Sequence, residues 1–97
     1  NLDPLIKKLK PLSLLRIKAN LNPISNELIK FDKHQDHPFK CKVAIYYLNT
    51  NNGYTMLEDK KVESKANRMV LFDSSIYHYG TNSTDSNNRI VINFNYF

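Results

Sequence analysis

The 97-residue chain contains a single cysteine, Cys41, so it cannot form an internal disulfide bond. Nothing in this cysteine content argues for secretion, and a reducing cytoplasm is the expected location. No apolar run approaches the roughly 18 residues that a membrane span needs. The N-terminus does not show the charged segment followed by an apolar stretch that marks a signal peptide. The chain begins at Asn1 and not at a methionine, which agrees with a sequence trimmed at its N-terminus.

Lysine is absent from the last third of the chain: all eleven lysines lie between Lys7 and Lys65. The net charge is +5, from 14 basic and 9 acidic residues. An excess of this size is too modest to predict nucleic-acid binding. It fits either an ordinary solvated surface or the attraction of an anionic substrate or partner.

Long helical patterns are also lacking. The one helical signal is at the N-terminus, where Asp3 and Pro4 have the form of an N-cap followed by a first-turn proline, and Pro11 ends the segment. The rest of the chain alternates apolar and polar residues or is rich in β-branched and aromatic residues, with polar turns between these stretches. Strands are expected over residues 15–21, 28–31, 42–48, 54–57, 61–63, 68–72, 76–79 and 89–97.

This pattern predicts one mainly β domain. Seven or eight short strands separated by turns favour a sandwich or barrel over a parallel α/β sheet. With 41% hydrophobic residues, a chain of this length can bury one core without disulfide or metal support.

Three residues suggest a metal site: His34 and Asp36 in one triplet, and His78 much later in the chain. Two imidazoles and a carboxylate can occupy one face of an octahedral metal, as in non-haem Fe(II) oxygenases. Residues i and i+2 of a strand point to the same side, so His34 and Asp36 can reach one metal together. His37 is an alternative ligand, although at i+1 from Asp36 it would point away on a regular strand.

The histidines also have simpler interpretations. A His-x-Asp triplet occurs often by chance, which would make His34 a surface loop residue and His78 a core histidine with one hydrogen bond.

The environment of the last expected strand also has two interpretations. Its alternation places Arg89 and Val91 on one face, and taken alone it favours water on that face. A polar cavity is the other choice, because an arginine there could hold a buried carboxylate.

The segment from His34 onward resembles the Fe(II)/2-oxoglutarate-dependent dioxygenases, nearest to the prolyl 4-hydroxylase branch with its compact phage and bacterial members. The resemblance covers roughly residues 30 to 97 and lies in four elements in order. These are the His34-Gln35-Asp36 triplet, the strand ending in Tyr46-Tyr47-Leu48-Asn49, His78 after Val70-Leu71-Phe72-Asp73, and Arg89 eleven residues later. The implied fold is a double-stranded β-helix (jelly-roll) with a short N-terminal helix.

The resemblance implies a role for each position. His34, Asp36 and His78 would bind Fe(II). Arg89 and the Tyr47 hydroxyl would bind the far carboxylate of 2-oxoglutarate, with Ile45 lining the same pocket; O₂ would be the second cosubstrate. Residues 1–97 would form a single oxygenase-like domain, N-terminally truncated, in the cytoplasm (a host cytoplasm if phage-encoded). The family's usual Gly-Gly pair is here Gly53-Tyr54, and its bracing N-terminal helices are represented by about ten residues.

Three functions follow as hypotheses. The first is an oxygenase that hydroxylates a C–H bond, prolyl hydroxylase-like or otherwise, while it decarboxylates 2-oxoglutarate to succinate. The second is a Zn-dependent hydrolase on the same ligands, which leaves Arg89 and Tyr47 without a role. The third is a non-catalytic jelly-roll that binds a ligand or partner. A peptide or other anionic substrate would suit a basic rim formed by Lys33, Lys40, Lys42, Lys60, Lys61 and Lys65.

Overall fold

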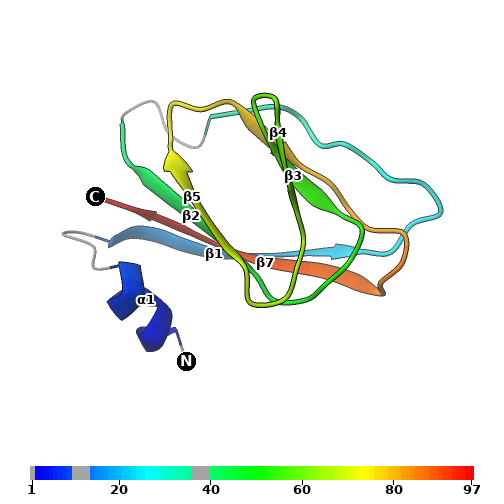
Figure 1. Ribbon diagram of the computed structural model, residues 1–97, viewed down its shortest axis with the longest axis horizontal. Coiled ribbons are helices and arrows are strands. Elements are labelled where there is room, and N and C mark those ends of the chain that lie inside the picture. Colours follow the sequence, from blue (N-terminus) through cyan, green and yellow to red (C-terminus); the bar gives the residue numbers. More distant parts are fainter. Residues whose placement is uncertain (1, 10–13, 36–39) are drawn as a thin grey trace.

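The computed structural model describes residues 2–9, 14–35 and 40–97, and within these ranges one short helix precedes seven strands (Figure 1). The elements are α1 (Asp3–Leu9), β1 (Leu14–Pro23), β2 (Lys42–Tyr47), β3 (Tyr54–Leu57), β4 (Lys60–Glu63), β5 (Met69–Asp73), β6 (His78–Gly80) and β7 (Asn88–Tyr96). The expected helix and most of the expected strands therefore form, with ends that differ by one or two residues.

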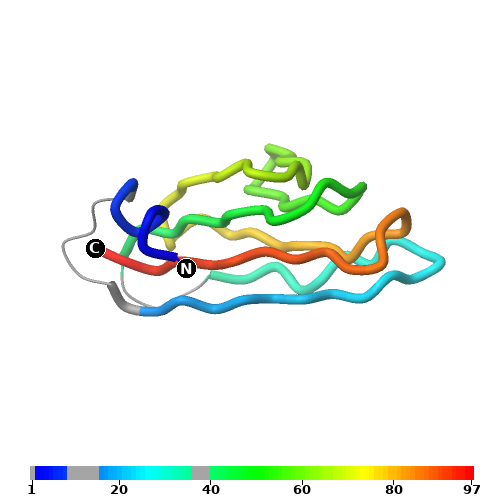
Figure 2. The backbone as a smooth tube through the Cα atoms, turned by 90° about the horizontal axis from the view of Figure 1, so that it is seen from below, coloured from blue at the N-terminus to red at the C-terminus, as the bar shows by residue number. Residues whose placement is uncertain are grey.

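The strands make two antiparallel sheets. The first has the order β1-β7-β2-β5 and the second the order β4-β3-β6. Figure 2 shows the strands of the first sheet following one another from β1 at the bottom to β5 at the top. Neighbours in the first sheet are distant in sequence, since β7 inserts between β1 and β2. The chain also passes several times from one sheet to the other. Together these features are the jelly-roll arrangement that the sequence predicts.

The strand expected over residues 28–31 does not form as a regular strand. The chain instead runs along the outer side of β6 and is held by two isolated bridges, Lys30 to Thr81 and His34 to His78. Lys30 and His34 are four positions apart, whereas their partners Thr81 and His78 are three positions apart. One extra residue therefore interrupts the ladder, as in a β-bulge. The backbone N–H of Ile29 donates to the Asn82 side chain, so this N–H group does not take part in the ladder either.

The outer face of the first sheet packs against α1. Phe94 and Tyr96 of β7 and Ala44 of β2 are buried there, together with Leu5 and other apolar residues. Alternation places successive β7 side chains on opposite faces, so these positions form the apolar outer row. A helix of seven residues is too short to be stable alone and depends on this contact. No helix in the described ranges is long and apolar enough to cross a membrane.

The inner face of the same sheet has a mixed character. Val43, Ile45, Tyr47 and Val91 form an apolar cluster with Val62 of β4. Arg89 lies on the same face as Val91 and is only 3% exposed. The face of β7 that carries Arg89 and Val91 therefore lies between the sheets and does not face water. This arrangement determines where a polar cavity can form.

Replacing Phe94 by Ala should destabilise the protein by about 3–5 kcal/mol, because it empties a site that is 0% exposed between sheet and helix. Leu71→Ala is the matched control on β5, where the side chain is 58% exposed, and should change stability by about 0.5 kcal/mol or less. Urea unfolding measures both. Equal costs for the two variants would contradict this description of the outer core.

Candidate functional site

A cavity of about 320 Å³ lies between the two sheets. The first sheet contributes residues of β1, β2 and β7 to its wall, and the second contributes residues of β3 and β6. His34, from the segment that runs beside β6, also lines the cavity. Four of the residues singled out from the sequence thus share one cavity: His34, Ile45, His78 and Arg89.

His34 and His78 are adjacent because their backbones pair. The His34 N–H donates to the His78 carbonyl over 2.8 Å, and the His78 N–H donates back over 2.9 Å. Their ring centroids are 4.4 Å apart at an interplanar angle of 52°. His78 is buried and also contacts the Phe72 ring, whereas His34 is exposed. Two imidazoles thus meet at one point of the cavity wall.

In both rings Nδ1 is hydrogen-bonded to the carbonyl oxygen of the residue two positions earlier. His34 Nδ1 lies 3.0 Å from the Asp32 carbonyl oxygen, and His78 Nδ1 lies 3.0 Å from the Ile76 carbonyl oxygen. A carbonyl oxygen only accepts hydrogen bonds, so Nδ1 is the donor in each contact, and in a neutral ring the lone pair is then on Nε2. Metal-binding histidines are commonly oriented in this way, with the second nitrogen bonded to a backbone carbonyl.

The third expected ligand, Asp36, lies outside the described residues, as does the alternative His37. Within the described ranges no group of three His, Cys, Asp or Glu side chains is placed to hold a metal ion. The described part of the chain therefore supplies a pair of adjacent histidines, and both their metal-binding role and the carboxylate of the predicted triad remain predictions.

Arg89 is buried without a carboxylate among the described residues. Its Nε donates to Ser64 Oγ over 2.9 Å and its Nη2 to Thr55 Oγ1 over 3.3 Å. Burial lowers the pKa of the guanidinium from its usual value, and the nearby Tyr47 raises it. A guanidinium remains charged at neutral pH all the same. The guanidinium carbon also lies 5.7 Å from the centroid of the Tyr47 ring. A buried cation whose described partners are neutral hydroxyls and an aromatic ring favours an anionic partner in the cavity it lines.

Tyr47 acts on the cavity through Thr55. Its hydroxyl donates to Thr55 Oγ1 over 2.8 Å, and its side chain is fully buried and is not among the described residues that line the cavity. Burial raises the pKa of the Tyr47 phenol, although Thr55 and Arg89 lower it, so the phenol keeps its proton. Thr55 Oγ1 thus accepts from both Tyr47 and Arg89, which leaves its own proton to donate.

The loop and strand around Arg89 are fixed by asparagines. Asn49 Nδ2 donates to the Asn88 carbonyl over 2.6 Å, and Asn49 Oδ1 accepts from the Ile90 N–H over 3.1 Å. These two bonds flank Arg89 and hold the start of β7. The Gly53 N–H donates to Asn51 Oδ1 over 2.9 Å, which places Gly53 directly beside the arginine stem.

Several of these residues were not identified from the sequence as site residues. Thr55, Ser64 and the Asn49 side chain hold Arg89, yet nothing in their spacing marks them, because each contact joins segments far apart in the chain. Arg16 and Lys18 of β1 also line the cavity. Their signal was available in the sequence, since both lie on the polar face of an alternating strand.

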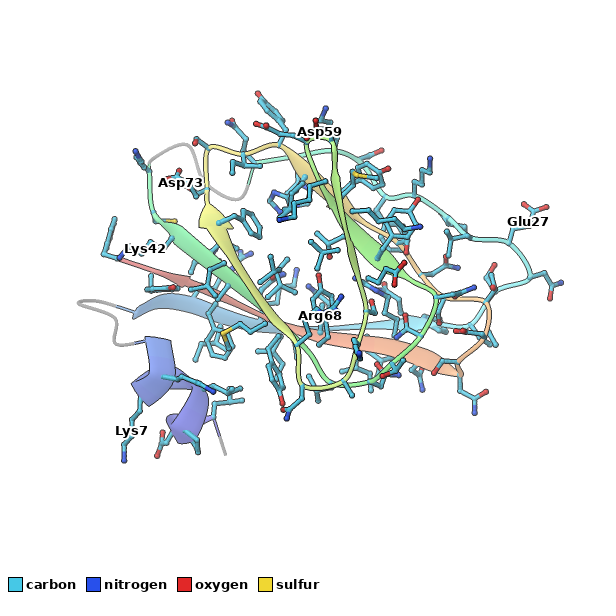
Figure 3. All side chains as sticks on the ribbon, viewed as in Figure 1. Lys7, Glu27, Lys42, Asp59, Arg68 and Asp73 are labelled. Atoms are coloured by element: carbon cyan, nitrogen blue, oxygen red, sulfur yellow. The ribbon has the colours of Figure 1, made fainter. Side chains whose placement is uncertain are left out.

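The charges that line the cavity differ from the expected basic rim. Of the described residues in its wall, Arg16, Lys18 and Arg89 are cationic and none is acidic. The six rim lysines are not in the wall; Lys40 pairs with Asp73 at 3.6 Å, and Lys61 lies over the Tyr54 ring. Figure 3 shows the labelled acidic side chains Glu27, Asp59 and Asp73 at the periphery of the molecule. The cavity is therefore a cationic one.

The fold is that of a cupin-type jelly-roll. The chain is similar to an RmlC-like cupin protein from Desulfovibrio desulfuricans, known from its crystal structure, with a TM-score of 0.56 and 15% sequence identity. The similarity covers 84% of this chain and 82% of that one. No protein-family model and no curated protein matches the sequence. At this identity the likeness establishes the architecture, and the function must be argued from the site.

Gly53→Ala should displace Arg89 and destabilise the protein by about 1–3 kcal/mol, as overpacked interiors do. A Cβ at position 53 would lie 2.5 Å from Arg89 Cδ and 2.6 Å from the Asn82 carbonyl oxygen. Gly80→Ala is the control, because its Cβ would approach only Arg89 Nη1, at an ordinary 3.6 Å. Urea unfolding and the NMR resonance of the Arg89 Nε–H report the effect. An unmoved resonance and unchanged stability in Gly53→Ala would contradict the close approach.

Proposed function

We propose that this protein is an Fe(II)- and 2-oxoglutarate-dependent dioxygenase that hydroxylates a C–H bond and converts 2-oxoglutarate to succinate and CO₂. The observation that carries the proposal is the position of the His34–His78 pair in the same cavity as Arg89, a buried cation with no carboxylate among the described residues. A nitrogen ligand pair beside an anion site is what binding of a metal and a keto acid requires.

The two described histidines have the chemistry of metal ligands. His34 and His78 would bind it through Nε2, since their Nδ1 atoms are bonded to carbonyl oxygens. The family resemblance supplies Asp36 as the carboxylate ligand. Fe(II) held by two histidines and a carboxylate keeps open positions for a cosubstrate and for O₂, and activation of O₂ is the chemistry that it supplies.

Arg89 would bind the far carboxylate of 2-oxoglutarate. The guanidinium is already oriented by Ser64 and Thr55, so binding would require little reorganisation. The Thr55 hydroxyl proton would be donated to the same carboxylate, and Tyr47 would orient Thr55. A direct Tyr47 hydrogen bond to the carboxylate stays a prediction. Ile45 and Val91 provide an apolar wall for the methylene carbons of the cosubstrate.

The Zn-dependent hydrolase uses the same metal ligands but gives the buried arginine no role. Burying a guanidinium is costly unless it is paired, so a site that retains one is expected to use it. A non-catalytic jelly-roll would bind an anion at Arg89 without needing the histidine pair. The oxygenase is the hypothesis that uses both features, and a prolyl hydroxylase-like substrate is one form that it can take.

Turnover tests this function directly. With Fe(II), O₂ and ascorbate, the protein should convert 2-oxoglutarate to succinate, and Zn(II) should not replace Fe(II). His34→Ala and His78→Ala should each abolish conversion and reduce Fe(II) binding by orders of magnitude, because three ligands leave no redundancy. His37→Ala should stay active. Succinate formation that survives loss of His34 but not of His37 would show that the other histidine is the ligand.

Arg89→Leu should weaken 2-oxoglutarate binding by about 2–4 kcal/mol, since it removes the cation from a buried carboxylate. Arg68→Leu is the matched control: Arg68 is exposed and donates to the Glu63 carbonyl. Tyr47→Phe should cost about 0.5–2 kcal/mol. Calorimetry in the presence of the metal measures all three, and Fe(II) affinity should stay nearly unchanged. Normal 2-oxoglutarate affinity in Arg89→Leu would refute the assignment.

A further inference from the structure

The cavity has a second cationic end, on β1. Arg16 and Lys18 line it, followed along the strand by Asn20 and Asn22. β1 pairs with β7 in a register that sets Lys18 opposite Asn93 and Asn22 opposite Arg89. Paired residues of an antiparallel ladder point to the same face, so this basic row and the Arg89 row face the same space. The proposed cosubstrate site uses Arg89 and leaves Arg16 and Lys18 without a role.

The two ends are far enough apart to bind two groups. Asn93 lies four residues after Arg89 on β7, a separation of about 13 Å at the usual rise of a strand. Lys18 is at the Asn93 end, and Arg16 lies two pairs further, opposite Asn95. In the proposed cosubstrate site one carboxylate of 2-oxoglutarate is assigned to Arg89 and the other to the metal, so neither is available to this end. A second anion would be needed to neutralise it.

A buried acceptor lies at the same place. Asn93 Oδ1 is inaccessible to solvent and has no hydrogen-bond donor among the described residues. Buried carbonyl oxygens nearly always have a partner, so this one is expected to receive a donor from a ligand or a water molecule. A ligand with a hydroxyl or amide N–H close to its anionic group would satisfy Asn93 and the adjacent Lys18 together.

Edge protection is the other explanation for a lysine here. β1 is at the edge of its sheet, and edge strands carry lysines that discourage pairing with other chains. Inward-pointing charges serve that purpose too, and Arg16 and Lys18 are both exposed. Edge protection does not account for the neighbouring asparagine with an unsatisfied oxygen, or for a cavity wall that has no acidic residue among those described.

We propose that Arg16 and Lys18 form a second anion subsite, which binds a carboxylate or phosphate group of the primary substrate at the end of the cavity away from Arg89. The naming of that ligand as the substrate rests on the proposed function; the subsite itself does not. The cavity volume is at the lower end of the range of roughly 300–1,000 Å³ for small-molecule sites, so the group belongs to a small anionic molecule.

Titration with inorganic phosphate, followed by ¹H–¹⁵N NMR at constant ionic strength, tests the subsite in the metal-free protein. Saturating shifts are expected in the amides of Arg16, Lys18 and Asn93, separate from shifts around Arg89. The double variant Arg16→Gln/Lys18→Gln should weaken the first set by about tenfold or more, the effect of roughly 1.4 kcal/mol, and leave the second set in place. Lys7→Gln/Lys8→Gln, on exposed positions of α1, removes the same charge and should change neither set.

Two further titrations identify the group and separate the two proposals. Methylphosphonate and propionate at matched concentrations show whether phosphate or carboxylate is preferred. 2-Oxoglutarate in the Zn(II)-loaded protein should shift the Arg89 set and leave phosphate binding on β1 intact. Phosphate binding on β1 without any 2-oxoglutarate binding would contradict the proposed function and leave the subsite standing. Shifts that spread over all lysine-bearing surfaces without saturating, or that survive in the Arg16/Lys18 double variant, overturn the subsite.

Discussion

The candidate site depends on one buried charge. Arg89 sits between the sheets with its stem against Gly53 and its nitrogens on the hydroxyls of Thr55 and Ser64. Removing a guanidinium from water is costly, and neutral hydroxyls offset that cost only in part. The fold nevertheless keeps this residue in place, with Asn49 bonded to the backbone on both sides of it. Such an arrangement is preorganised for an anion that completes the charge pairing.

The jelly-roll provides the cavity around that charge by giving the two faces of β7 different environments. Phe94 and its outer neighbours pack on α1, and the inner positions, Arg89 to Asn93, face the second sheet. The irregular pairing that brings His34 onto His78 places two imidazoles in the same space. An interrupted ladder beside a site is a common device for redirecting a side chain. The histidine pair and the buried arginine therefore share one cavity because of one strand arrangement.

The sequence predicted the elements well where alternation was regular, as in β7 and β2, because a period of two reports directly on burial. It failed over residues 28–31, where the Asn82 side chain and an extra residue break the ladder, and neither leaves a mark in local composition. His34 and His78 were singled out through residue chemistry and a family resemblance, and the structure places them side by side in one cavity. Thr55 and Ser64 were missed, because contacts that join distant segments have no local pattern.

The central claim is that one cavity binds a metal at the histidine pair and a keto acid on Arg89 at the same time. The most direct measurement is the visible absorption of the protein mixed anaerobically with Fe(II) and 2-oxoglutarate. We expect a charge-transfer band that is present only when all three are combined and is absent in His78→Ala. In Arg89→Leu the band should require a much higher 2-oxoglutarate concentration. No band at saturating metal and cosubstrate would contradict the account.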